Sequence, residues 1–495
     1  MSYLFKTADI NMIRSKAIDL IKTFNEEEFR QFGLYTESPY FNRELIQVKF
    51  YELLKKYYPE FKARTFTKEQ VYSKLYPGKT FNDGIMRNIL SKTLELAENF
   101  LAIKQFRDDE FNHSLHMLQA IAKKGNDKLF GKVEVKAAGL LEKSQVKDEM
   151  YFLNLYLLNN EKRLFSKNQK SSLYFPDELL KSSTESISLS FLIFMLRNYT
   201  DIANTNLKMF RFEEHASLTE FEKYADSEVK KYKDTEYLQY YYYSFKLAKS
   251  QDEKYFFELK KIADLSHLKF SERDRRDIFT ILTNFCYFKV NSGDLNFRRE
   301  HFQLLRENFE RGTYKGIRNY VDHINYLNVT VTGLDAGEIE WVEEFILKYK
   351  PELDDSNREN SFNFANALVY YKKGNYDEAL NKAAKVKTDD LSYKHQLKSL
   401  YMKIYFEMNV IEPFYSHVDS YRHFLLNEKH IPENTRNSIN NYVNFTKKLF
   451  DIKIRSSAKD FEIHKVRKEL LESKAIVNKL WLLDKVTEIE NSLPG

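Results

Sequence analysis

The feature that most limits the folds open to this 495-residue chain is a pair of helical patterns at residues 361–386, which are joined by one turn. The segment reads SFNFANALVYY, then KKGN, then YDEALNKAAKV. Apolar residues recur at helical spacing on both sides of Gly374. Glycine turns the chain at the end of a helix with little steric cost. Two such short helices need neighbours to cover their apolar faces, so the segment predicts a larger helical array.

The segment resembles the tetratricopeptide repeat, a helix–turn–helix unit of about 34 residues. Five positions match the family in residue type, namely Ala367, Tyr370, Gly374, Tyr376 and Ala379. Four positions depart from it: Asn363 and Asn366 replace the usual Trp and Leu, and Ala383 and Val386 replace Phe and Ala. The resemblance implies that the two helices approach closely at the small residues 367 and 379, with the ring of residue 370 beside them.

Three further hairpins are expected from similar turns. The turn residues are Gly293 in YFKVNSGDL, Gly333 in VTVTGLDAGEIEW and Asn409 in YFEMNVIEP. The spacing between successive turns is irregular and mostly longer than the family period. We therefore expect degenerate repeats in which each hairpin packs only against its neighbours.

The chain has only 13 Gly and 8 Pro, too few turn formers for a protein with many β-hairpins. No segment shows the alternating pattern of a strand. We predict an all-α fold and, through the resemblance, a right-handed α-solenoid of helical hairpins with a distinct helical N-terminal region. The predicted parts are an N-terminal helical region at 1–106, weakly repeat-like hairpins at 107–235, degenerate repeats at 236–430 and capping helices at 431–495.

The net charge, the single cysteine and the length of the apolar stretches argue against several classes of protein. The net charge of +6 comes from 78 basic and 72 acidic residues, which predicts a mixed surface rather than a polyanion-binding one. The single cysteine, Cys286, excludes an intrachain disulfide and a cysteine-based zinc site, and its apolar context predicts burial. The longest apolar stretch, 187–196, is about half of a membrane span and is expected to be a buried helix. With no secretory signal at the N-terminus, these features predict a cytoplasmic protein without membrane contact.

The N-terminal region allows two interpretations. Thr67 can cap a short helix that stops before Pro77, and Asn82 or Asp83 can cap a long one. The favoured interpretation is a helical cap of the array. A short helix before a long one is also the outline of a helix-turn-helix domain, although the connector is longer than usual. In that alternative, four residues of the long helix would face DNA: Arg87, Asn88, Ser91 and Lys92.

The sequence holds two groups of candidate metal ligands. Glu110 and His113 share a helix face with His116, as in half of a di-iron ligand set. No second pair of this spacing occurs, so a surface cluster is the favoured interpretation. His417 and His423, with Asp419 between them, are similarly few and poorly spaced. The sequence contains no HExxH, GxSxG or Gly-rich phosphate loop, and we expect neither catalysis nor a cofactor or metal.

These observations predict a non-catalytic scaffold or adaptor that holds another protein; the alternative is a nucleic-acid-linked regulator with a DNA-contacting N-terminal region. A solenoid offers an extended surface, and the 34 Tyr and 40 Phe suit interface cores. Tyr314 and Tyr320 are the candidate partner-binding residues, because Gly312 and Gly316 interrupt the helix around them. The alternative for both tyrosines is packing between hairpins.

Overall fold

The computed structural model describes residues 13–63, 65–168, 177–209, 216–266, 269–291, 294–314, 320–387, 390–455, 460–473 and 475–492. Among these residues the only extended pairing is an isolated bridge between Val321 and Leu353. The remainder is helical or lies in turns, which confirms the all-α prediction. The chain forms two compact units: unit 1 is Met1–Ser144 with Leu153–Ile187, and unit 2 is Gln145–Phe152 with Ser188–Gly495. The finer four-part division stays a prediction.

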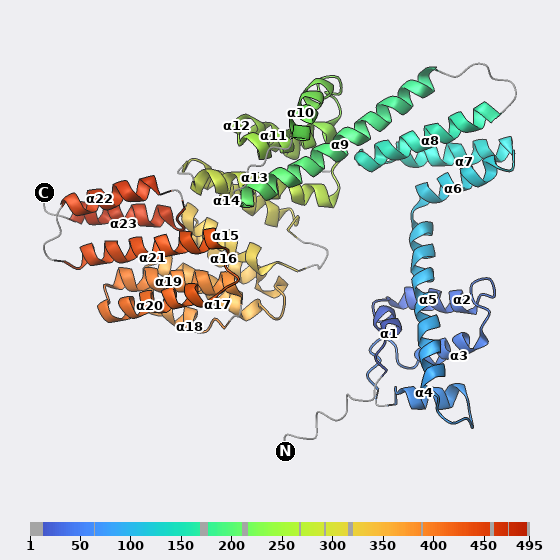
Figure 1. Cartoon of the computed structure of the whole chain (residues 1–495), viewed down its shortest axis with the longest axis horizontal. Helices are drawn as coiled ribbons and strands as arrows, with labels where there is room; N and C mark the ends of the chain where they lie inside the picture. Colours follow the sequence, from blue (N-terminus) through green and yellow to red (C-terminus); the bar gives the residue numbers. More distant parts are fainter. Residues whose placement is uncertain are drawn as a thin grey trace. The chain divides into compact units, whose positions relative to one another are not determined.

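Unit 1 begins with a helical bundle followed by a hairpin. Its helices are α1 (Lys16–Ile21), α2 (Glu26–Glu37), α3 (Leu45–Leu54), α4 (Lys68–Leu75), α5 (Asp83–Asp108), α6 (Glu110–Ala122) and α7 (Asp127–Glu142). Two further helices, α8 (Glu149–Asn168) and α9 (Asp177–Met209), belong partly to each unit. In Figure 1 the long helix α5 runs along the bundle, and each of α1 to α4 contacts it.

The helix starts in unit 1 follow capping rules. The Thr67 side chain accepts a hydrogen bond from the Gln70 backbone and starts α4, and the Asn82 side chain does the same for Ile85 in α5. The cap at Thr67 was predicted from the sequence, and of the two caps predicted for the long helix, Asn82 or Asp83, the structure uses Asn82. The bundle core is aromatic, with Phe32 buried against the ring of Phe100 at 5.7 Å.

Unit 2 contains a series of helical hairpins. Its helices are α10 (Ala216–Glu228), α11 (Glu236–Ser250), α12 (Glu253–Ser266), α13 (Glu272–Asn291), α14 (Phe297–Glu310), α15 (His323–Ala336), α16 (Ile339–Tyr349), the short η2 (Lys350–Glu352), α17 (Arg358–Lys372), α18 (Tyr376–Ala384), α19 (Leu391–Met408), α20 (Ile411–Asn427), α21 (Glu433–Lys453), α22 (Asp460–Glu472) and α23 (Lys479–Ser492).

Neighbouring helices of unit 2 pack in pairs. The paired helices are α11 with α12, α13 with α14, α15 with α16, α17 with α18, and α19 with α20. The second helix of each pair also contacts the first helix of the next, and first helices contact each other from α15 to α17 and from α17 to α19. This packing is compatible with a helical-repeat solenoid.

The predicted turns have different outcomes. Gly374 (φ +76°) and Asn409 (φ +55°) adopt the left-handed conformation and end α17 and α19, as predicted. The turn assigned to Gly333 was wrong: this residue lies inside α15, and the helix ends at Gly337 (φ +87°). Glycine is needed at 333 because α16 approaches closely, and a Cβ atom there would lie 2.5 Å from Val342. The predicted turn at Gly293 lies outside the described residues.

The small residues of the α17–α18 hairpin are fully buried. Ala367 on α17 and Ala379 on α18 have no exposed surface, and neither has Ala383 one turn further on. The two helices are in close contact. The burial agrees with a tight approach of the helices at these positions.

Two apolar features predicted to be buried behave differently. Cys286 on α13 is fully buried, as expected, and burial raises the pKa of its thiol. The stretch 187–196 lies in α9, where Leu192 and Ile193 are buried but Phe191 is 48% exposed, so it is buried on one side only. Among the described helices, α9 alone is long and apolar enough, over Glu178–Ala203, to cross a membrane by length and composition; 39% of its most apolar window is buried.

Candidate functional site

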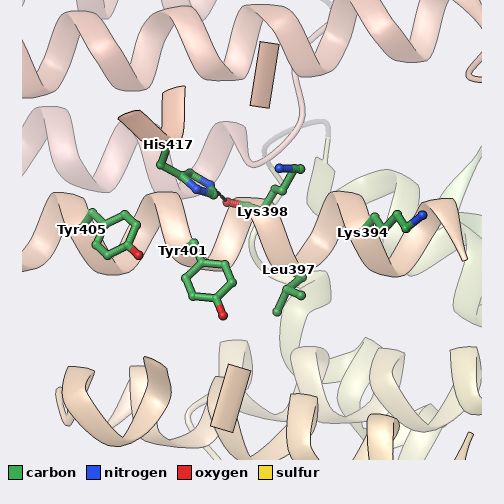
Figure 2. Close-up of a pocket in the computed structure, with 6 residues that line it drawn as sticks. All are labelled: Lys394, Leu397, Lys398, Tyr401, Tyr405 and His417. Carbon is green, nitrogen blue, oxygen red and sulfur yellow. Dashed lines mark hydrogen bonds between the residues drawn. The ribbon is translucent and has the colours of Figure 1, made fainter. Parts of the chain in front are cut away.

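A cleft of about 270 Å³ lies between α19 and α20. Five of its lining residues come from α19 and one from α20: Lys394, Leu397, Lys398, Tyr401, Tyr405 and His417. The lysines and tyrosines among the five recur three or four positions apart, and Leu397 precedes Lys398, so all five lie toward one face of the helix. Figure 2 shows them along α19, with the imidazole beside the backbone of that helix. We call this site the α19–α20 cleft.

Lys398 is the most informative cation of the cleft. Its ammonium donates a hydrogen bond to the Ser420 hydroxyl at 3.0 Å and lies 5.6 Å from the centre of the Phe424 ring. It forms no ion pair with any carboxylate among the described residues, and burial lowers its pKa. A half-buried ammonium without a counter-ion favours an anionic ligand.

Two tyrosines extend the donor set along α19. The rings of Tyr401 and Tyr405 lie 6.1 Å apart at 25°. Neither hydroxyl has a hydrogen-bond partner within the described part of the chain, and both side chains are half-buried. The cleft therefore combines an apolar wall with hydroxyl groups that can donate to a ligand.

His417 closes the cleft from α20. Its Nε2–H donates to the backbone carbonyl of Lys398 at 2.7 Å (Figure 2), and its ring lies 5.8 Å from that of Tyr401. Because a carbonyl only accepts, this bond leaves Nδ1 without a proton. Burial lowers the pKa of His417 to about 4, so the imidazole is neutral at pH 7. The positive charge of the cleft therefore comes from its lysines alone.

The cleft has the chemistry of a binding site for an anionic side chain. None of its six lining residues is acidic, and two are lysines. Its volume is slightly below the roughly 300–1,000 Å³ typical of pockets that enclose a small molecule. No group of three or more metal-binding side chains occurs in the described part of the chain.

The opposite face of α19 is covered by the C-terminal segment. Trp481 of α23 donates its indole N–H to the Tyr371 hydroxyl of α17 at 2.9 Å, and its ring lies 5.3 Å from that of Phe406. The Asn478 side chain accepts a hydrogen bond from Lys403 at 2.9 Å. Burial lowers the pKa of Lys403 to about 8. These contacts fix one face of α19 and leave the cleft face open.

A buried ionic network holds α8, α9 and α13 together. The Arg197 guanidinium bonds Glu149, Asp274 and the Tyr241 hydroxyl. The Tyr237 hydroxyl donates to the same aspartate. Burial raises the pKa of Glu149. Apart from Glu149 Oε2, which has no hydrogen-bond partner among the described residues, the group is paired around one guanidinium and joins these helices, which is a structural role.

The candidate partner-binding tyrosines are both half-buried. Tyr314 stacks on Phe309 at 4.3 Å and donates its hydroxyl to Glu352 at 2.6 Å. Gly312 has φ +69° and interrupts the helix as expected, whereas Gly316 lies outside the described residues. Neither tyrosine lines the α19–α20 cleft, and their role in partner binding stays a prediction.

The residues predicted to face DNA occupy an exposed part of α5 with balanced charge. Arg87 pairs with Asp83 at 2.9 Å, and Lys92 pairs with Glu44. Exposed residues of α5 nearby include Asn88, Ser91, Glu95 and Glu98. Carboxylates therefore neutralise the two cations, and contact with DNA stays a prediction.

The two histidine groups that were candidate metal ligands contact aromatic rings. The rings of His113 and His116 each lie 5.5 Å from that of Phe106. His417 belongs to the cleft, whereas Asp419 and His423 are exposed on α20.

The lysines and tyrosines of the cleft were not predicted from the sequence. Their signal is the repetition of lysine and tyrosine through YKHQLKSLYMKIY, at three- and four-residue spacing. In a chain so rich in both residue types, that signal does not distinguish a site from an ordinary helix face until α20 is placed beside it.

The chain matches no protein-family model, no curated protein and no solved structure. Its function therefore has to be inferred from its own residues.

Proposed function

We propose that this chain is a non-catalytic scaffold or adaptor that holds another protein, built as a right-handed, tetratricopeptide-like α-solenoid. The paired helices of unit 2 support the solenoid, because each hairpin packs against the next. The turn at Gly374 and the buried Ala367 and Ala379 support the family resemblance at one hairpin. We place the protein in the cytoplasm as part of the same proposal.

The α19–α20 cleft is the observation that carries the binding role. It presents Lys398, Tyr401 and Tyr405 on helices, with their polar groups unpaired by any carboxylate of the described chain. Aromatic side chains that combine a ring with a polar end are enriched in protein interfaces. Groups held on packed helices lose little conformational freedom on binding, which favours association.

Cross-linked affinity purification tests this proposal with Lys398→Glu, which reverses the charge of the cleft. Lys348→Glu on α16 is the matched control, because Lys348 is exposed and forms no ion pair among the described residues. We expect the wild type and the control to recover the same partner protein, and the cleft variant to lose it. Circular dichroism checks that both variants are folded.

Two outcomes would count against the proposal. If all three forms recover the same proteins in equal amount, partner binding does not use this cleft. If no protein is recovered and the chain turns over a metabolite in an activity screen, the scaffold function is wrong.

A further inference from the structure

We propose that the α19–α20 cleft binds an acidic segment of the partner protein, with a carboxylate of that segment on the Lys398 ammonium and its neighbouring residues against Tyr401 and Tyr405. This inference rests on the proposed function and specifies the chemistry of the partner. The occupant follows from charge complementarity, because Lys398 has no carboxylate partner among the described residues and the lining holds no acidic residue.

The donors suit a carboxylate. A half-buried ammonium whose one protein hydrogen bond goes to Ser420 keeps further N–H groups available, since an ammonium has three. The Tyr401 and Tyr405 hydroxyls point away from the Lys398 ammonium (Figure 2), so they can donate to other polar groups of the same segment. Hydrogen bonds between charged groups are roughly twice as strong as neutral ones. A carboxylate in the cleft can therefore accept a charged hydrogen bond from the Lys398 ammonium.

The walls of the cleft suit the rest of a peptide. Leu397 and the rings of Tyr401 and Tyr405 form an apolar surface beside the donors. An acidic residue next to an apolar one in the partner segment would use both kinds of surface. At about 270 Å³ the cleft accommodates side chains rather than a folded element.

A nucleic acid fits these observations less well. Binding that depends on phosphates uses several cations along a groove, and bases stack on aromatic faces. Only Lys394 and Lys398 are cationic in this lining, and His417 is neutral at pH 7 because burial lowers its pKa to about 4. One ammonium without a carboxylate partner among the described residues, that of Lys398, matches a single carboxylate better than a phosphate backbone.

The test uses fluorescence anisotropy with the full chain and a labelled peptide of three Glu-Leu-Glu-Glu repeats. A peptide with Gln in place of Glu and single-stranded oligothymidylate of about twelve nucleotides serve as comparison probes. We expect the acidic peptide to bind, the Gln peptide to bind at least tenfold more weakly, and affinity to fall when salt rises from about 0.05 to about 0.5 M.

Two variants probe the donors. Lys398→Gln is expected to weaken acidic-peptide binding about tenfold, which is the loss of one charged hydrogen bond. The double variant Tyr401→Phe with Tyr405→Phe removes only the hydroxyls and should weaken binding about fivefold. The matched controls are Lys348→Gln and Tyr287→Phe, at exposed positions outside the cleft, and should stay within about twofold of the wild type.

The inference is overturned if Lys398→Gln binds the acidic peptide as the wild type does, or if the Gln peptide binds equally well. Tighter binding of oligothymidylate, lost in the same variants, would assign the cleft to nucleic acid instead. If the partner protein is lost with Lys398→Glu while the acidic peptide does not bind, the scaffold function stands and the acidic segment is wrong.

Discussion

Gly333→Ala is expected to destabilise unit 2, although alanine normally favours a helix over glycine. Gly333 lies inside α15, where a Cβ atom would lie 2.5 Å from Val342 and 3.2 Å from Phe302. Ordinary contacts begin near 3.4 Å, so α15 and α16 must separate by about an ångström at this point. Val342 is fully buried and β-branched, and it has little freedom to move aside.

The net effect follows from two opposing contributions. Overpacking a buried contact this tight costs about 3 kcal/mol. Replacing glycine by alanine in a helix interior returns about 1 kcal/mol. We therefore expect a net loss of about 2 kcal/mol in the free energy of unfolding. Gly131→Ala on α7 is the matched control, because a Cβ atom at Gly131 meets nothing within 4 Å, and this change should stabilise unit 1 by up to about 1 kcal/mol.

Tryptophan fluorescence during urea unfolding measures unit 2 specifically. The chain has two tryptophans, Trp341 and Trp481, and both lie in unit 2. Trp341 is next to Val342 in sequence and its ring lies 5.0 Å from that of Phe302, so it reports directly on the perturbed contact. Far-UV circular dichroism follows the Gly131→Ala control.

A double variant isolates the cause. Val342→Ala removes the side-chain atom that a Cβ at position 333 would meet, so Gly333→Ala should be far less harmful in that background. The reasoning is refuted if Gly333→Ala leaves the unfolding midpoint unchanged or raises it. Equal losses in both backgrounds would show that the damage arises elsewhere.

Three further results are expected. Ala379→Leu should overpack the α17–α18 contact and cost about 1–3 kcal/mol, and an unchanged urea midpoint would mean that the repeat register is wrong there. Trp481→Phe removes the hydrogen bond to Tyr371 and should lower stability by about 1 kcal/mol and speed amide hydrogen exchange in α23; unchanged exchange would contradict that anchoring role. Burial lowers the pKa of His395 and His417 to about 4, against 6.5 when unfolded, so stability is complete above pH 6.5 and falls as pH approaches 4. The free energy of unfolding, measured by urea unfolding, should therefore fall less from pH 7.5 to pH 4.5 in the His395→Gln, His417→Gln double variant than in the wild type, by about 2 kcal/mol per histidine.

The all-α class could be predicted because low glycine and proline content and helical periodicity are properties of the local sequence. The starts of α4 and α5 were predicted for the same reason, since Thr67 and Asn82 satisfy backbone N–H groups a few residues away. Gly333 misled the prediction because glycine serves two purposes. A glycine ends a helix where φ is positive, but it also allows a neighbouring helix to approach, and only the position of α16 shows which purpose applies.

The candidate site could not be predicted because its chemistry depends on the absence of a carboxylate near the Lys398 ammonium. Lys398 is one of many lysines, and only the folded chain shows that no carboxylate of the described residues pairs with it. Tyr314 was proposed as a partner contact because Gly312 and Gly316 flank it, and that role stays a prediction; the fold shows in addition that its ring stacks on Phe309 and its hydroxyl donates to Glu352. Whether a side chain has an ion-pair or hydrogen-bond partner within the chain depends on the tertiary structure and cannot be read from its residue type.

The two faces of α19 together explain how an open cleft can be rigid. Ser399 and Lys403 are four residues apart on one side of the helix and both bond Asn478, just before α23. Lys398 and Tyr401 are three residues apart on the opposite side, since about 100° of helix rotation separates successive residues. Contacts made by the chain's own C-terminal segment therefore hold the back of α19. The cleft-facing side chains pack in part against the neighbouring apolar cores and stay half-buried, so a ligand can still reach them. A binding surface fixed from behind loses little entropy when a partner segment docks, which favours the scaffold role proposed for this helix.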